Sequence, residues 1–135
     1  VVLHVVRAHG EVLQILERRG RLARGGLSHA FSGSLEIARR SIELGLLISV
    51  GGSVVRKKGF ETLKRAVVKI PPEALVIESD APDQAPEGWC ERTGLGWNEP
   101  SSVLEVARAV AELRGERAEE VLERSARNLL RVFGE

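Results

Sequence analysis

Short apolar runs rich in β-branched residues alternate along this chain with segments of helical periodicity. The runs predict strands at 1–6, 25–31, 46–50 and 74–77. Helices are expected at 8–19, between Ser34 and Gly45, and at 60–70, 102–113 and 118–133. Because strands and helices alternate, we expect parallel strands joined by crossover helices, which is an α/β fold.

Four βα units fit two architectures. An open, doubly wound sheet can hold four strands, whereas a (β/α)₈ barrel needs eight strands and typically about 250 residues. The 135 residues therefore form one domain, 1–135, that is either a small open sheet or half of a barrel. The chain has no methionine and starts inside an apolar run, which favours a chain that is entered in mid-fold.

The composition is that of a soluble globular protein, with 43% hydrophobic and 29% charged residues. The formal net charge is only +1, so any recognition of phosphate must be local. No apolar run approaches the roughly 20 residues of a membrane span, and the start lacks the basic leader of a signal peptide. The single cysteine, Cys90, excludes an internal disulfide and favours a reducing cytoplasm.

Polar residues stand near the ends of three predicted strands: His4, His29 and Asp80. A lone histidine in an apolar strand is more often a core residue than a ligand. Here the three residues would meet at the carboxyl end of a parallel sheet, where functional groups gather. Imidazole and carboxylate are ligands for Zn²⁺ or Mn²⁺. The pattern therefore predicts a metal site, with Asp80 as a ligand or as the group that takes a proton from metal-bound water.

The segment 29–34, His-Ala-Phe-Ser-Gly-Ser, precedes a predicted helix. Free backbone N–H groups and the helix dipole would favour an anion there, such as a phosphate beside the metal. Ordinary helix capping by Ser34 explains the same residues equally well.

The segment 80–100 is expected to be a long functional or mobile loop. Trp89 and Trp97 flank it, and they would either stack on a base or pin the loop to the fold. Ser102 and Glu105 have the spacing of a capping box at the start of the next helix.

Five segments resemble the successive motifs of TatD-type metal-dependent hydrolases, a family of the amidohydrolase superfamily. They occur in the family's order and at about its spacing, and they cover essentially the whole chain. The segments are Val-Val-Leu-His ending at His4, the segment 29–34, Glu-Ser-Asp-Ala-Pro at 78–82, Asn-Glu-Pro at 98–100 and the closing segment 128–134.

The resemblance implies half of a (β/α)₈ TIM barrel, made of strands five to eight with their helices. Family members hydrolyse phosphodiester bonds in DNA, often as 3′ exonucleases, with two divalent metal ions, expected to be Zn, Mn or Mg. By this resemblance His4 and His29 would bind one ion, and Asp80 would bind the other and orient the attacking water. Ser32 and Gly33 would lie near the scissile phosphate.

The chain also departs from the family pattern. The His-x-His of the first barrel strand and the acidic residue that bridges the two metals have no counterpart here. The segment 5–9, Val-Val-Arg-Ala-His, replaces the family's Arg-Asp pair. We expect Arg7 in this segment to be a further phosphate contact. Ser79 stands where threonine is usual, and Trp97 stands where a basic residue is common. We therefore expect weak metal binding and little or no hydrolysis by this chain alone.

Two other functions stay open at this point. One is a hydrolase of the D-aminoacyl-tRNA deacylase kind on the same scaffold, and the other is a non-catalytic α/β scaffold that keeps the motifs. The expected partners are DNA or another phosphodiester, and either the absent N-terminal half or a second copy of the chain. A half-barrel would bind the N-terminal half or a second copy through its exposed sheet edges.

Overall fold

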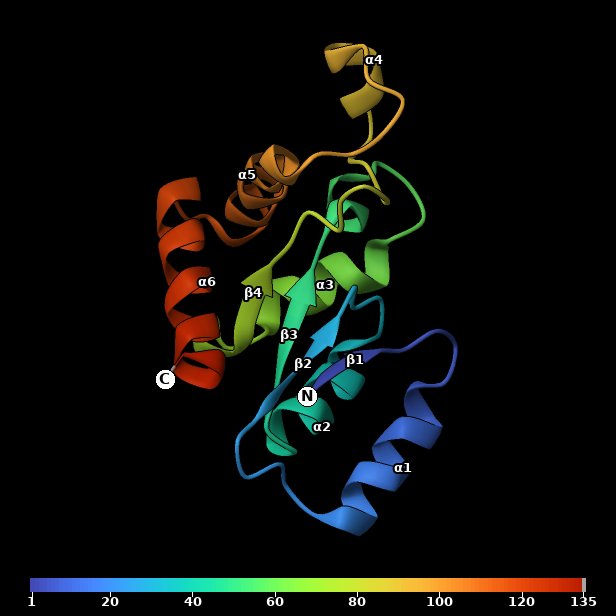
Figure 1. Ribbon diagram of the computed structural model, residues 1–135, viewed down its shortest axis with the longest axis vertical. Helices are drawn as coiled ribbons and strands as arrows, with labels where there is room; N and C mark the ends of the chain where they lie inside the picture. Colours follow the sequence, from blue (N-terminus) through green and yellow to red (C-terminus); the bar gives the residue numbers. More distant parts are fainter. Residues whose placement is uncertain (135) are drawn as a thin grey trace.

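The computed structural model describes residues 1–134 and contains one parallel sheet with the strand order β1-β2-β3-β4. The strands are β1 (Val2–His4), β2 (Gly26–His29), β3 (Leu46–Val50) and β4 (Leu75–Ile77). Because all neighbouring strands are parallel, their carboxyl ends lie together, toward the top of Figure 1. The predicted α/β alternation is confirmed.

Helices connect the strands and follow the last one. They are α1 (His9–Arg19), α2 (Leu35–Glu43), α3 (Glu61–Lys69), α4 (Trp89–Thr93), α5 (Val103–Arg114) and α6 (Ala118–Phe133). Short 3₁₀ turns lie at Gly52–Val55, Pro72–Ala74 and Pro100–Ser102.

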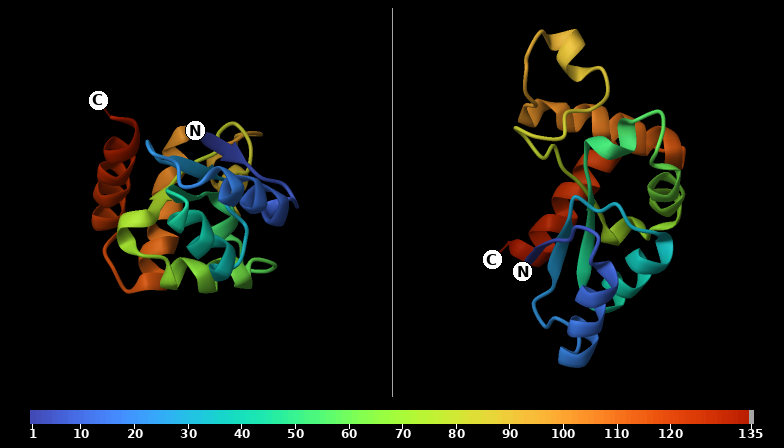
Figure 2. Two further views of the ribbon diagram at one scale, coloured as in Figure 1. Left: turned by 90° about the horizontal axis from the view of Figure 1, so that it is seen from below. Right: turned by 90° about the vertical axis from the view of Figure 1, so that its right-hand side faces the viewer.

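Apolar clusters cover the two faces of the sheet. The larger cluster joins Ile48, Val50, Leu75 and Ile77 to side chains of α2, α3 and α5. The smaller cluster consists of Leu27, Leu47 and Val76, against which Leu129 and Val132 of α6 pack. Accordingly, α6 lies on the side of the sheet away from α2 and α3, as the right-hand view of Figure 2 shows. The alternation of side chains along each strand explains why neighbouring residues belong to different clusters.

The face that carries the smaller cluster becomes polar toward the carboxyl ends of the strands. Residues two apart in a strand share a face, so polar residues follow apolar ones on the same side. His4, His29, Ser49 and Glu78 follow Val2, Leu27, Leu47 and Val76 in this way. This polar end of the face is called the rim below.

The two edges of the sheet differ. On the outer edge of β4, Ile77 N–H donates to Ser125 Oγ (3.0 Å), and Asn128 Nδ2 donates to the carbonyl of Leu75 (2.9 Å). Two side chains of α6 thus take the place of a neighbouring strand. At the other edge, β1 has β2 as its one strand neighbour within residues 1–134. Val2 there is 58% exposed.

Several local expectations are refined by the structure. Ser34 caps α2 as predicted, since its Oγ accepts a hydrogen bond from Ile37 N–H (3.4 Å). The capping box at Ser102 is wrong, because a 3₁₀ turn precedes α5 and gives Ser102 helical angles (φ −63°, ψ −15°) instead of the extended conformation of a cap.

The segment 80–100 is more structured than a plain loop. It contains α4, which is bounded by the left-handed residues Gly88 (φ 79°) and Gly94 (φ 73°). Figure 1 shows this segment projecting beyond the carboxyl ends of the strands. Trp89 is buried, whereas Trp97 is exposed. None of the helices in the described chain is long and apolar enough to cross a membrane.

Candidate functional site

The rim brings together the two histidines that were predicted as ligands. His4 and His29 are paired positions of β1 and β2. Their ring centroids are 5.4 Å apart and their planes are tilted by 42°. Side chains at paired positions of neighbouring strands point to the same face, so both imidazoles face the same space in front of the rim.

His29 lies between two carboxylates. Its Nδ1 is 2.7 Å from Glu78 Oε2, and its Nε2 is 2.9 Å from Asp80 Oδ1. A carboxylate on Nδ1 fixes the proton on that nitrogen and the direction of the ring, which is the arrangement that many metal-binding histidines use. The other nitrogen is then directed toward Asp80.

Glu78 organises the segment that carries His29, and sequence reasoning assigned it no role. Its Oε1 accepts a hydrogen bond from Ala30 N–H (2.6 Å). Its Oε2 accepts hydrogen bonds from His29 Nδ1 (2.7 Å) and Ser49 Oγ (2.5 Å). The sequence did contain a signal for it, because Glu78 precedes Asp80 by two residues and continues the inward alternation from Val76.

The backbone is unusual where the strands end. Arg7 (φ 53°), Ala30 (φ 47°) and Asp80 (φ 57°) adopt the left-handed region that non-glycine residues rarely enter. Each of them follows a different strand within three residues. Such conformations persist where surrounding contacts enforce them, and they are frequent at functional sites. At Ala30 the enforcing contact is the hydrogen bond to Glu78.

A buried asparagine holds the loop that carries Asp80. Asn98 Nδ2 donates to the carbonyl of Ser79 (2.6 Å) and to that of Asp83 (2.7 Å). Gln84 Nε2 donates to Asp80 Oδ2. The Asn-Glu-Pro motif therefore shapes the loop around Asp80 from 18 residues further along the chain.

The residues predicted to contact phosphate lie near the rim but make no side-chain hydrogen bond there. Within residues 1–134 no hydrogen bond involves the side chain of Arg7 or Ser32, and both are exposed. Gly33 is packed so tightly that a Cβ would lie 2.8 Å from Phe31 Cζ. Their phosphate contacts stay a prediction.

The third histidine of the chain, His9, lies against the apolar core. Its ring packs on Phe31, with centroids 5.6 Å apart. Burial lowers the pKa of His9 below the ordinary value for histidine, which favours the neutral imidazole at neutral pH.

The donors at the rim suit a divalent metal ion in chemistry and in pairwise spacing. Two imidazoles on one tetrahedral ion, with bonds of about 2.0–2.1 Å, place their ring centroids about 5 Å apart, close to the 5.4 Å observed for His4 and His29. His29 Nε2 lies 2.9 Å from Asp80 Oδ1, so the Asp80 carboxylate stands directly beside the imidazole of His29. Within the described chain, however, no group of three or more His, Cys, Asp or Glu residues is arranged to hold an ion. These residues therefore fit as part of a coordination sphere.

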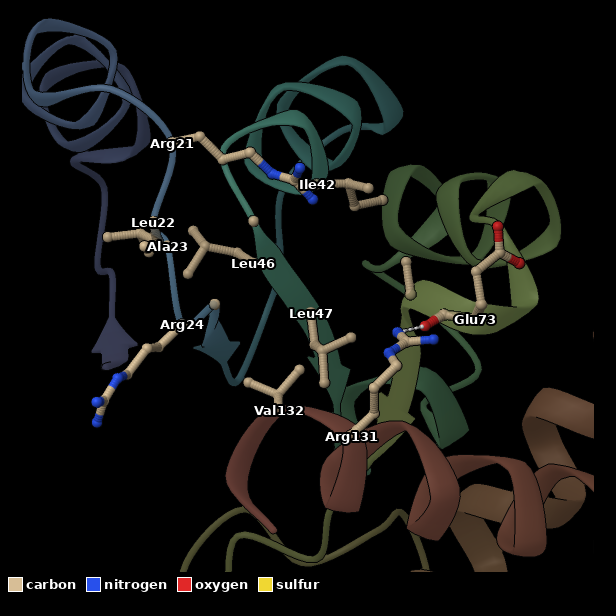
Figure 3. A pocket seen from close by; sticks show the side chains of 13 residues that line it. Arg21, Leu22, Ala23, Arg24, Ile42, Leu46, Leu47, Glu73, Arg131 and Val132 are labelled. Carbon is tan, nitrogen blue, oxygen red and sulfur yellow. Dashed lines mark hydrogen bonds between the residues drawn. The ribbon is translucent and has the colours of Figure 1, made fainter. Parts of the chain in front are cut away.

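A separate cleft lies at the amino end of the sheet. It has a volume of about 590 Å³, and Figure 3 shows Leu46, Leu47 and Val132 on its walls with Arg21 and Arg131 beside them. Arg131 Nη2 donates to the carbonyl of Glu73 (2.5 Å). None of the rim residues lines this cleft, so it is separate from the histidine and carboxylate cluster.

Comparison with protein families gives one match that spans the described chain. Residues 1–134 match the family described as TatD related DNase. Relatives named uncharacterized metal-dependent hydrolases include YabD of Bacillus subtilis, 35% identical over 98% of this chain and 50% of its own, and YjjV of Escherichia coli, 34% identical over 98% and 49%. A Klebsiella pneumoniae relative named 3′-5′ ssDNA/RNA exonuclease TatD is 30% identical over 99% of this chain and 51% of its own. The chain thus spans about half the length of the curated relatives that it matches.

Solved structures show the same relation. The crystal structure of Escherichia coli YjjV aligns over 100% of this chain and 50% of its own, with a TM-score of 0.87 and 32% identity. A TatD family hydrolase from Entamoeba histolytica aligns over 99% of this chain and 50% of its own, with a TM-score of 0.80 and 19% identity. The second likeness concerns the fold alone.

Proposed function

Because the chain belongs to the TatD-related DNase family, we propose that it supplies half of the catalytic centre of a metal-dependent hydrolase that cleaves phosphodiester bonds in DNA. The observation that carries the proposal is the position of His29, between Glu78 on one ring nitrogen and Asp80 on the other, with the ring of His4 at 5.4 Å.

The residues of the rim have distinct roles in this proposal. His4, His29 and Asp80 would hold divalent metal ions (Zn, Mn or Mg), of which the complete enzyme would have two. When bound, such ions lower the pKa of a coordinated water and stabilise negative charge on a phosphate. Glu78 keeps the proton on Nδ1 of His29 and so presents Nε2 as a ligand. Asp80 accepts the proton of the attacking water.

The substrate side of the site is formed by the turn between β2 and α2. Ser32 and Gly33 lie there, directly before the capped N-terminus of α2, where backbone N–H groups favour an anion. Arg7 is exposed at the end of β1 and supplies a positive charge from the neighbouring connection. The Klebsiella relative named an ssDNA/RNA exonuclease supports single-stranded DNA as the substrate to test first.

We further propose that this chain is the second half of a (β/α)₈ barrel, in which the complementary half pairs with both edge strands, β1 and β4. A closed barrel also requires a strand beside β4, where Ser125 and Asn128 bind the backbone at two positions, whereas β1 has β2 as its one strand neighbour within residues 1–134. The coverage of about half of each relative supports this arrangement. A chain without its complement would self-associate through β1, and a clean monomer in sedimentation would count against the half-barrel. The single cysteine supports the cytoplasm as the place of action.

Metal binding and hydrolysis test the proposal in two steps. Calorimetry with Zn²⁺ or Mn²⁺ should detect weak binding to the 135-residue chain and its loss in His29→Ala. A 3′-labelled single-stranded oligonucleotide should stay intact with the chain alone, but should be degraded when the matching half of a relative such as YjjV is added with metal. Cleavage that persists in Asp80→Asn, or no metal binding by wild type, would contradict the assignment. If the assembled protein deacylated D-aminoacyl-tRNA but did not cleave DNA, D-aminoacyl-tRNA would replace DNA as the proposed substrate.

A further inference from the structure

A buried hydroxyl stands behind the histidine and carboxylate cluster. Ser49 lies on β3, the strand between those that carry His29 and Glu78, and it is only 1% exposed. Its Oγ donates to Glu78 Oε2 at 2.5 Å. A hydroxyl buried in a strand is unfavourable unless it is hydrogen-bonded, so this contact accounts for a serine at this position.

Ser49 and His29 bind the same carboxylate oxygen. Glu78 Oε2 accepts both the Ser49 hydroxyl and the Nδ1 proton of His29 (2.7 Å), while Oε1 accepts Ala30 N–H (2.6 Å). With donors on both oxygens, the carboxylate can turn only by breaking hydrogen bonds. The carbonyl of Ser49 also accepts the N–H of Phe31 (2.9 Å), so Ser49 holds the segment after β2 by a second route.

We propose that Ser49 is a positioning residue, which fixes the imidazole of His29 for metal binding by holding the Glu78 carboxylate. The proposal deepens the proposed function and rests on it, since the metal at His29 belongs to that function.

Two other buried serines in the described chain bind only backbone groups. Ser41 Oγ donates to the carbonyl of Ile37 within α2, and Ser125 Oγ accepts a backbone N–H of β4. These contacts stabilise secondary structure. Ser49 is the buried serine within residues 1–134 whose hydroxyl binds an ionisable side chain.

The test compares Ser49→Ala with Ser49→Thr, which keeps a hydroxyl, and with Ser41→Ala as a matched loss of a buried hydroxyl away from the rim. The first readout is the His29 Nδ1–H resonance of the metal-free protein in long-range ¹H–¹⁵N spectra. The second is the dissociation constant for Zn²⁺. Circular dichroism and backbone amide spectra establish that each variant is folded. If Ser49→Ala does not fold, Ser49→Cys replaces it, because cysteine is close in size and only a weak donor.

We expect Ser49→Ala or Ser49→Cys to shift or broaden the His29 Nδ1–H resonance and to weaken Zn²⁺ binding about tenfold, the lower end for residues that orient a metal ligand. Ser49→Thr and Ser41→Ala should keep the wild-type signal and affinity. An unchanged Nδ1–H resonance in a folded Ser49→Ala protein would overturn the proposal. If wild type bound no Zn²⁺, the proposed function would fail, while the metal-free spectra would still decide whether Ser49 positions His29.

Discussion

The two ends of the sheet in this chain are built on different principles. At the carboxyl end, the rim holds His29 between Glu78 and Asp80, and the backbone after three strands adopts left-handed conformations. At the amino end, Leu27, Leu47 and Val76 pack against α6, whose Asn128 binds carbonyls of the β4 segment.

The difference shows how one scaffold separates stability from chemistry. Apolar contacts and satisfied backbone groups at the amino end lower the free energy of the folded state. The rim contains polar side chains and left-handed backbone that lower stability by themselves and are retained where a site needs them. Substitutions at the amino end should therefore change the free energy of unfolding, and substitutions at the rim should change metal binding.

The largest effect is expected for Leu47→Ala at the amino end. Leu47 is 4% exposed and belongs to the smaller apolar cluster, so its truncation should lower the free energy of unfolding by about 2–5 kcal/mol. Urea unfolding followed by tryptophan fluorescence measures the change. Zn²⁺ affinity of the folded variant should stay at the wild-type value. A loss of affinity without a loss of stability would contradict the separation of the two ends.

His29→Ala, at the rim, should weaken metal binding while leaving the free energy of unfolding nearly unchanged. Removal of a ligand should weaken Zn²⁺ binding by more than about 100-fold, the upper end of the effect of residues that only orient a ligand. The free energy of unfolding should change by less than about 1 kcal/mol, because the side chain is partly exposed. Calorimetry and urea unfolding provide the two values. His9→Ala is the control and should leave the affinity unchanged.

Two asparagines provide a matched pair, since each donates two hydrogen bonds to backbone carbonyls. Asn98 does so in the loop beyond the rim and Asn128 at the amino end. Asn128→Ala leaves buried carbonyls unpaired and should lower the free energy of unfolding by about 1–3 kcal/mol. Asn98→Ala should mainly increase hydrogen exchange in the loop that carries Asp80 and weaken metal binding. Equal effects of the two substitutions on unfolding and on metal binding would remove the distinction between the ends.

The smallest effect concerns pH and the turn between α5 and α6. Burial alone raises the pKa of Glu116, but hydrogen bonds from Arg124 and Arg114 outweigh it and leave the pKa below the usual range. A depressed pKa in the folded state contributes stability above the unfolded pKa, about 4.3 for glutamate, and this contribution is lost as pH falls through the folded pKa.

Glu116→Gln tests this contribution. At neutral pH the variant should be less stable than wild type by up to about 1 kcal/mol, and the difference should shrink as pH falls below about 4. Urea unfolding at a series of pH values measures it. A difference that grows toward acid pH would show that Glu116 acts in the opposite direction.

Much of this arrangement was predictable from the sequence. The order of strands and helices follows from periodicity, and the position of His4, His29 and Asp80 at one end follows from parallel strands. Their membership in one metal site stays a prediction.

Other features depend on tertiary contacts that no local pattern encodes. The role of Glu78 requires the left-handed turn at Ala30, which brings a backbone N–H to the carboxylate. Ser102 matches a capping box in sequence, but the preceding 3₁₀ turn sets its backbone angles. The exposure of β1 depends on which strand lies beside it, and the cover of β4 depends on where α6 crosses the edge.

The most direct test uses the chain's three imidazoles, His4, His9 and His29, as reporters in one Zn²⁺ titration followed by long-range ¹H–¹⁵N spectra. If the rim holds the metal, the nitrogen resonances of His4 and His29 should move together to values of metal-bound imidazole, while His9 keeps its free position. The account would be contradicted if His4 and His29 responded at different metal concentrations, or if all three rings responded alike.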